Sequence, residues 1–243
     1  MGVPTLGCHC VVCESSDPHD KRLRPSLMLE YGGRTVLIDT TPDFRTQAIL
    51  AKIERLDAVL YTHGHADHIL GLDDIRPYNI KQRGVVRLFA AEDTLAILRR
   101  TFAYVFSGKP TDSSIPLVEL QAVDGPFDLF GLRVTPVAAH HGPEPVLGYR
   151  FGKLAYLTDF SKVPENSKEL LRGLDVFVLD ALRHEPHPMH STVEQSLQLV
   201  DELKPRQAWF THICHDLGHA ETNSALPDNV RLAYDGLKFE VQV

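Results

Sequence analysis

Three imidazoles and a carboxylate crowd the segment YTHGHADHILGL, residues 61–72, in which His63, His65, Asp67 and His68 occupy six positions. They directly follow an apolar run, DAVLYT, that is typical of a buried strand. Residues two apart on an extended chain point the same way, so His63 and His65 can bind one ion. Asp67 and His68 lie at the turn beyond, where they can face a second ion. A polar loop rich in histidine is the alternative, but clustered ligands of this kind usually mark metal sites.

A second cluster consists of three thiols near the start of the chain, Cys8, Cys10 and Cys13. They lie too close together to pair sensibly with one another, and no secretory apolar segment precedes them. The pattern therefore favours metal ligation in a reducing compartment over a disulfide framework. Three thiolates supply most of a tetrahedral zinc site, which normally closes with a fourth ligand. Three reduced cysteines without a metal are the alternative.

The composition sets the class of protein. The 243 residues, 43% of them hydrophobic, predict a single domain over 1–243 with a sizeable core. The net charge of −7 argues against a broad basic face for long nucleic acid. No apolar run approaches the ~20 residues that span a bilayer, so we expect no membrane association. Together with the reduced cysteines, this predicts a cytoplasmic location.

Strands and helices alternate along the chain. In the first half we expect two strands around Gly32-Gly33, a helix over 42–53, a strand over 57–62, a loop and helix over 65–75, a strand over 86–90 and a helix over 92–106. In the second half we expect strands over 132–139, 146–151, 153–159, 175–181 and 207–213, and a helix over 192–204 capped by Thr192. The result is an α/β chain with two similar halves, best packed as two sheets with helices outside.

The segment THGHADH matches the HxHxDH signature of the metallo-β-lactamase-fold hydrolases. Four later segments resemble that family in the same order: 141–152, 156–161, 186–192 and 210–215. The segments GVPTLGCHCVVC (2–13) and LPDNVRLAYDGLKFEV (226–241) are similar to a narrower branch, the PhnP-like phosphoribosyl cyclic phosphate phosphodiesterases, which are related to RNase Z. The resemblance implies an αββα sandwich, in which two mixed sheets pack face to face with helices outside.

The resemblance also implies a ligand set for two divalent ions. One ion is expected to be bound by His63, His65 and His141, and the other by Asp67, His68 and His212, with Asp159 bridging both. His140 is the alternative to His141, but the family places the ligand directly before a glycine. A helix cap after a strand is the alternative role for Asp159.

Nitrogen and oxygen ligands without thiolate suit Zn²⁺, Mn²⁺ or Fe²⁺. Two such ions acidify a shared water and stabilise charge that develops during an in-line displacement. We therefore expect hydrolysis by metal-activated hydroxide, with Asp67 counted among the catalytic residues as well as the ligands.

A departing sugar alkoxide needs a proton, and histidine suits that role near neutral pH. His184, His187 and His190 compete for it. The resemblance favours His190, because the family places a loop histidine over the metals there. A solvated loop histidine or a partner of the helix start is the alternative.

For the thiol cluster, the PhnP-like branch has a histidine at His215, which would close a structural zinc site with Cys8, Cys10 and Cys13. Cys214 is the alternative fourth ligand, and His9 is less suited because it sits between ligands. Asp39 is expected to support a ligand histidine or its loop, with a plain turn aspartate as the alternative. Arg76 and Arg183 are expected to be solvated rather than phosphate ligands.

Relatives usually begin with a strand before the GVP segment, whereas this sequence starts at Met1-Gly2-Val3-Pro4. Either this start is internal to a longer chain, or the sheet lacks that edge strand. A missing first strand would expose a sheet edge, which favours self-association as a homodimer.

The favoured function is a phosphodiesterase that acts on a small anionic phosphodiester, with a cyclic phosphate as one candidate substrate. An RNase Z-like nuclease is the first alternative, and the acidic balance counts against it. A thioesterase or lactonase of the glyoxalase II type is the second, because the metal ligands alone would serve it equally well. A metal-binding module without activity is the least favoured reading.

Overall fold

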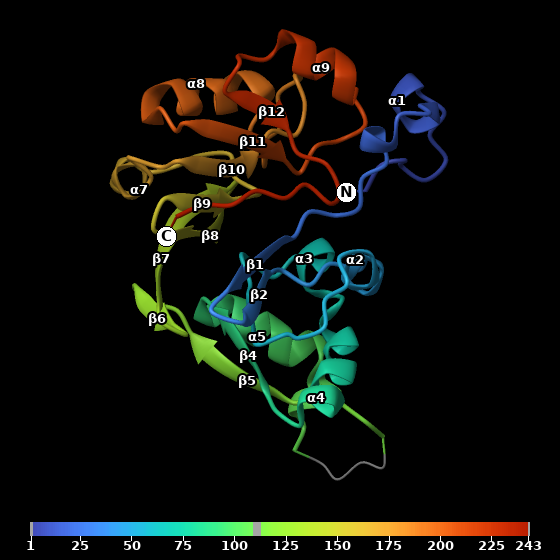
Figure 1. Cartoon of the computed structure of the whole chain (residues 1–243), viewed down its shortest axis with the longest axis vertical. Helices are drawn as coiled ribbons and strands as arrows, with labels where there is room; N and C mark the ends of the chain where they lie inside the picture. Colours follow the sequence, from blue (N-terminus) through green and yellow to red (C-terminus); the bar gives the residue numbers. More distant parts are fainter. Residues whose placement is uncertain (1, 109–112, 243) are drawn as a thin grey trace. The chain divides into compact units, whose positions relative to one another are not determined.

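The computed structural model describes residues 2–108 and 113–242. Its internal contacts divide the chain into two compact units, Arg24–Gly125 and the combination of Met1–Leu23 with Pro126–Val243. Each unit is built on one sheet, and they are called the five-stranded unit and the seven-stranded unit below. Two mixed sheets accompanied by helices agree with the predicted α/β class (Figure 1).

The sheet of the five-stranded unit has the order β1-β2-β3-β4-β5. Its strands are β1 (Leu27–Tyr31), β2 (Arg34–Ile38), β3 (Ala58–Leu60), β4 (Val86–Ala90) and β5 (Val118–Ala122). β1 runs antiparallel to β2 at one edge, and β2 to β5 are parallel. The predicted hairpin is confirmed, because Tyr31 pairs with Arg34 across Gly32 and Gly33, whose φ angles are 54° and 72°. Such turns need positive φ at both central positions, and glycine adopts it without strain.

Helices of the five-stranded unit connect its parallel strands. They are α2 (Phe44–Leu50), α3 (Ala66–Ile69), the 3-10 helix η2 (Leu72–Ile75), α4 (Arg76–Gln82), α5 (Glu92–Thr101) and α6 (Ala103–Phe106). The expected single helix over 92–106 is wrong, because Phe102 leaves helical geometry at φ −108° and ψ 43°. The Phe102 ring is buried in the core of this unit together with Leu95 and Leu98. Burial of that ring accompanies the break between α5 and α6.

The sheet of the seven-stranded unit has the order β12-β11-β10-β9-β8-β7-β6. Its strands are β6 (Phe127–Leu129), β7 (Leu132–His141), β8 (Glu144–Phe151), β9 (Leu154–Leu157), β10 (Val176–Asp180), β11 (Gln207–Thr211) and β12 (Val230–Leu232). β6 to β9 are antiparallel neighbours, and β9 to β12 are parallel. The carboxyl ends of the parallel strands therefore meet at one edge, where ligands usually bind.

The helices of the seven-stranded unit include two from the start of the chain. They are α1 (Val11–Glu14), the 3-10 helix η1 (Pro18–Asp20), α7 (Glu165–Leu170), α8 (Val193–Leu203) and α9 (His219–Ala225). The predicted cap of α8 is confirmed: Thr192 accepts a hydrogen bond from the backbone of Gln195, whose side chain accepts one from Thr192 N–H. This reciprocal pair is a capping box. Across the described residues, no helix is both long and apolar enough to cross a membrane.

Candidate metal centre

The histidine-rich loop of the five-stranded unit starts where β3 ends. His63 and His68 are buried, and α3 begins at Ala66 directly after His65. The ring centroid of His63 lies 4.5 Å from that of His65 and 4.3 Å from that of His68. Oδ2 of Asp67 lies 3.9 Å from Nε2 of His68. The four residues that the sequence singled out here are therefore side by side.

Asp39 lies under this loop, at the end of β2. Its buried carboxylate accepts hydrogen bonds from the N–H and hydroxyl of Thr62, both at 2.8 Å, and from Nδ1 of His68 at 2.7 Å. A carboxylate only accepts, so the His68 proton lies on Nδ1 and the lone pair on Nε2. Burial raises the pKa of Asp39, and the charge and hydrogen bond of His68 oppose that rise. The structure thus gives Asp39 the supporting contact expected of it, and a carboxylate behind a histidine is the usual way to orient a metal ligand.

Gly71 allows the loop after α3 to press against the Asp39 loop. A Cβ at this position would lie 2.2 Å from the carbonyl oxygen of Thr41 and 2.7 Å from Cβ of Phe44. The Gly71 N–H donates to the carbonyl of Thr40 at 2.9 Å. Only glycine fits this close approach, which fixes the position of α3 and its histidine.

In the seven-stranded unit, His141 ends β7 and is buried. Its Nδ1 donates to the carbonyl of Met189 at 2.7 Å, which again leaves the lone pair on Nε2. Gly142 follows at φ 60°, and a Cβ there would lie 2.3 Å from Sδ of Met189. The adjacent His140 is exposed, and its backbone pairs with Lys162. The geometry therefore favours His141 over His140 as the ligand.

Asp159 and His212 follow the ends of β9 and β11. Both are buried, and Nε2 of His212 lies 3.3 Å from Oδ1 of Asp159. Asp159 also accepts a hydrogen bond from the Thr158 hydroxyl at 2.7 Å. Their φ angles of 55° and 53°, like the 63° of Asp39, lie in the left-handed region. This conformation costs about 1–3 kcal/mol per residue outside glycine, and it concentrates at functional sites.

β10 lies between β9 and β11 and ends at Asp180, a residue that the sequence analysis did not single out. Oδ2 of Asp180 lies 2.9 Å from Nδ1 of His190. Burial raises the pKa of Asp180 well above its usual range, the positive charge of His212 opposes the rise and the charge of Asp159 adds to it. In the sequence, Asp180 looks like an ordinary strand end. Its place next to the expected site follows only from the position of β10 between β9 and β11, which Asp159 and His212 follow.

The His190 ring lies against two expected ligands. Its centroid is 4.8 Å from that of His212, in a stacked arrangement, and 4.6 Å from that of His141. Ligand atoms of His141, Asp159 and His190 all lie within 4.8 Å of one another. His190 is therefore within reach of the expected metal site, either as a proton donor or as a further ligand.

The other candidates for the proton donor differ in their surroundings. His184 is exposed and its Nδ1 lies 2.7 Å from Oε1 of Glu194, at the start of α8. His187 lies next to His190, with ring centroids 5.0 Å apart. Of the two arginines, Arg76 is bound to Asp73, and Arg183 binds backbone carbonyls of its own loop. Both arginines therefore have structural partners on the protein.

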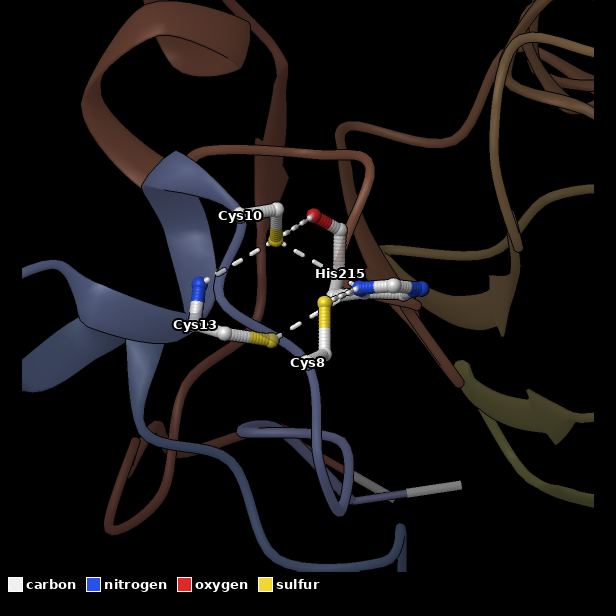
Figure 2. Close-up of side chains that lie close together, drawn as sticks. All are labelled: Cys8, Cys10, Cys13 and His215. Atoms are coloured by element: carbon white, nitrogen blue, oxygen red, sulfur yellow. Dashed lines mark hydrogen bonds between the residues drawn. The ribbon is translucent and has the colours of Figure 1, made fainter.

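The three early cysteines gather around one nitrogen of His215 (Figure 2). The Sγ atoms of Cys8, Cys10 and Cys13 lie 3.2, 3.4 and 3.6 Å from Nδ1 of His215. With bonds of about 2.3 Å to sulfur and about 2.0 Å to nitrogen, tetrahedral zinc puts such atoms roughly 3.5 Å apart. The N–H of Cys13 lowers the pKa of Cys10 to about 6, which favours a thiolate. These four side chains therefore fit a zinc ion in number, type and spacing.

The two alternative fourth ligands have other partners. Cys214 is buried, and its thiol lies 3.1 Å from Oδ2 of Asp216, while burial raises its pKa to about 11. His9 is exposed and bonds to Glu14 at 2.9 Å. The structure thus favours His215 as the residue that completes the cysteine cluster.

Arg22 makes a further connection that the sequence analysis missed. Its guanidinium pairs with Asp20 at 3.1 Å and donates to the carbonyls of Cys214 and Leu217, at 3.4 and 2.9 Å. The side chains of Arg22 and Asp20 are both buried. Arg22 thus fastens the N-terminal segment to the loop that follows His212.

Comparison with known proteins identifies the class. Residues 34–213 match the family model described as the Beta-lactamase superfamily domain. The chain belongs to this superfamily, whose fold implies binding of divalent metal, and the prediction of a metal-dependent hydrolase is confirmed at the level of the family. More narrowly, the chain is 52% identical to a solved structure described as a new diphosphatase from the PhnP family. That match covers 100% of this chain and 94% of the other, with a TM-score of 0.94.

Three other similarities are more distant or partial. Zinc-bound PqqB from Methylobacterium extorquens shares the fold, with a TM-score of 0.77 and 21% identity over 99% of this chain and 96% of PqqB. A ribonuclease Z from Clostridium kluyveri is 21% identical over 84% of this chain and 87% of the enzyme. An octanoyltransferase from Porphyromonas gingivalis is 39% identical over 98% of this chain but 49% of that protein. The chain thus spans about half the length of that last relative.

Proposed function

We propose that the protein is a dinuclear metal-dependent phosphodiesterase that hydrolyses a small anionic phosphodiester or diphosphate. The observation that carries this proposal is that, in each unit, histidine and aspartate side chains gather after the ends of the strands. In the five-stranded unit, Asp39 orients His68 beside His63. In the seven-stranded unit, the Met189 carbonyl orients His141, and Asp159 lies beside His212.

The proposed ligands divide into two sets that share one residue. His63, His65 and His141 serve the first ion, Asp67, His68 and His212 serve the second, and Asp159 serves both. Imidazole and carboxylate ligands suit Zn²⁺, Mn²⁺ or Fe²⁺. When bound, such ions acidify water and stabilise negative charge on the reacting phosphoryl group.

His190 is proposed to deliver the proton to the leaving group. The support is its Nδ1 contact with the buried carboxylate of Asp180, which places the remaining ring nitrogen, Nε2, away from that carboxylate. A carboxylate behind a histidine fixes the ring and stabilises its protonated form. Asp180 would therefore hold the His190 ring in one orientation for proton transfer.

A zinc ion bound by Cys8, Cys10, Cys13 and His215 is proposed as a third, structural site. Structural zinc sites contribute directly to folding. His215 lies three residues after His212, so this ion would hold the segment next to a proposed catalytic ligand.

Two kinds of substrate compete. The PhnP-family diphosphatase supports a phosphoric substrate, since it matches nearly the whole chain at 52% identity. The octanoyltransferase relative makes an octanoyl compound the second candidate, although half of that protein lies outside the match. The net charge of −7 continues to disfavour the RNase Z-like alternative with a long RNA.

A hydrolysis panel separates these candidates. Purified protein, loaded with Zn²⁺ or Mn²⁺, is assayed on cyclic phosphodiesters, linear phosphodiesters, dinucleoside diphosphates, an octanoyl thioester, a lactone and a precursor transfer RNA. We expect turnover of phosphoric substrates, and loss of one active-site ion in elemental analysis of His68→Ala. Thioester turnover without phosphoric turnover would overturn the proposed substrate, and full occupancy of both ions in His68→Ala would overturn the ligand assignment.

A further inference from the structure

The loop between β10 and α8 carries a histidine, His187, to which the proposed chemistry gives no role. It stands between Pro186 and Pro188. Proline fixes its own φ angle and restricts the residue before it to extended conformations. The backbone around His187 therefore has little freedom before any substrate binds.

Side chains hold this loop on both sides of His187. The guanidinium of Arg183 donates to the carbonyls of Glu185 and Pro186, both at 3.1 Å. On the other side, the carbonyl of Met189 accepts the hydrogen bond from His141. A group held in this way loses little conformational entropy when it binds a ligand.

The hydrogen bond at Nδ1 of His187 defines its tautomer. The backbone N–H of Met189 donates to this nitrogen at 3.2 Å, so Nδ1 carries the lone pair. The proton of the neutral ring is then on Nε2. Burial lowers the pKa of His187, and the positive charges of His190 and Arg183 lower it further. His187 can thus donate a hydrogen bond from Nε2 while the backbone holds its Nδ1.

The contrast with His190 separates the roles of the two rings, which lie 5.0 Å apart between centroids. Nδ1 of His190 contacts the carboxylate of Asp180, whereas Nδ1 of His187 accepts a hydrogen bond from a backbone N–H. The two rings therefore differ in their partners at Nδ1, and His187 is the one whose Nε2 carries the proton in its neutral form. A neutral imidazole is too weak an acid to protonate a leaving group, but its N–H binds an oxyanion well.

We propose that His187 is a substrate-binding residue whose Nε2–H donates a hydrogen bond to a phosphoryl oxygen of the substrate. This inference rests on the proposed function, since it gives that site a phosphate-recognising group next to the proton donor. The ligand class is the phosphoryl oxyanion, present in both phosphodiesters and diphosphates.

Three variants of the metal-loaded protein test this proposal. His187→Ala removes the donor, and His187→Gln restores an N–H near the position of Nε2. His184→Ala is the matched control, because it removes an exposed histidine of the same loop that bonds to Glu194. The measurements are the Kd of inorganic phosphate by calorimetry, the KM and kcat for the best phosphoric substrate, metal content and Tm.

A hydrogen bond to a charged acceptor is worth about tenfold or more in binding. We expect His187→Ala to weaken phosphate and raise KM by about tenfold, with metal content unchanged. His187→Gln should recover most of this loss, and His184→Ala should match the parent protein. Histidine ¹⁵N spectra should show the Nε2–H tautomer, and its resonance should shift when phosphate is added.

Two results would overturn the inference: unchanged phosphate affinity in His187→Ala, or equal losses in the alanine and glutamine variants together with a lowered Tm. The second pattern would show a purely structural role. The failure of the proposed function is a different result, in which the parent protein hydrolyses no phosphoric substrate. Phosphate binding still decides the role of His187 in that case.

Discussion

Nδ1 of His190 lies 2.9 Å from Oδ2 of Asp180, the last residue of β10, and this carboxylate is fully buried. The contact joins a loop histidine to the sheet edge at which Asp159 and His212 also lie. It gives the His190 ring a fixed orientation, which a proton donor needs. The first prediction follows from this pair.

Replacing His190 by alanine should reduce hydrolysis of a sugar phosphodiester on the order of 10²-fold or more, because the alkoxide would leave without a proton. A nitrophenyl diester, whose leaving group departs without a proton, should lose much less. Asp180→Asn should show the same pattern with a smaller loss. Steady-state rates on both substrates check this, and metal content serves as the control, since His190 lies within ligand distance of His141 and Asp159. Equal loss on both substrates would mean that His190 is not the acid.

The second prediction concerns the carboxylate behind His68. Asp39→Asn should weaken binding of one active-site ion by about 10- to 100-fold, since it removes the charge that orients the ligand and raises its basicity. Competition with a chelator measures the affinity. Asp43→Asn is the matched control, because Asp43 lies four residues away and binds Arg24. An equal affinity in the two variants would show that Asp39 does not tune the ion.

The third prediction concerns the cysteine cluster. Cys10→Ser should lower the zinc content by one equivalent and lower the Tm, because a structural zinc stabilises the folded state directly. Cys214→Ser should keep that zinc, since the Cys214 thiol is engaged with Asp216. Elemental analysis and thermal unfolding report both quantities. An unchanged zinc count in Cys10→Ser would exclude the structural site.

The fourth prediction concerns stability in acid. Burial alone would raise the pKa of Asp57, but hydrogen bonds from Arg55, the Thr35 N–H and Arg34 bring it to about 2. Its folded pKa is thus below the unfolded value of about 3.9. Asp57 therefore stabilises the protein fully above about pH 4, and this contribution disappears as the pH falls from about 4 towards 2.

Urea unfolding of metal-free protein at several pH values measures this effect. Asp57→Asn should be less stable than the parent at pH 7, and the difference should shrink below pH 4. Glu54→Gln is the control, because its pair with Lys81 is exposed and contributes little. A difference that stays constant down to pH 3 would contradict the assigned pKa shift.

Local patterns explain what was predictable from the sequence. The hairpin at Gly32-Gly33 and the cap at Thr192 each depend on a few adjacent residues, and both are present. The histidine loop was recognisable because its ligand types recur within six positions after an apolar strand. These features need no knowledge of distant contacts.

Long-range contacts explain what was missed. The position of Asp180 in the site depends on the neighbouring strands β9 and β11. The structural role of Arg22 depends on the carbonyls of Cys214 and Leu217, which lie almost 200 positions away in the sequence. The strands β5, β6 and β12 were not predicted. β6 and β12 are only three residues long, and β5 owes its conformation to pairing with β4. The helix break at Phe102 likewise depends on ring burial in the core.

The seven-stranded unit takes its residues from both ends of the chain, whereas the five-stranded unit is one continuous segment. During synthesis, Cys8, Cys10 and Cys13 leave the ribosome well before His215, which follows Cys13 by 202 positions. Domains generally fold as units while the chain grows. The five-stranded unit can therefore form before His215 has been synthesised. The thiols must therefore stay reduced until His215 has been synthesised, and the cysteine cluster can close only on a chain that already includes the loop after β11.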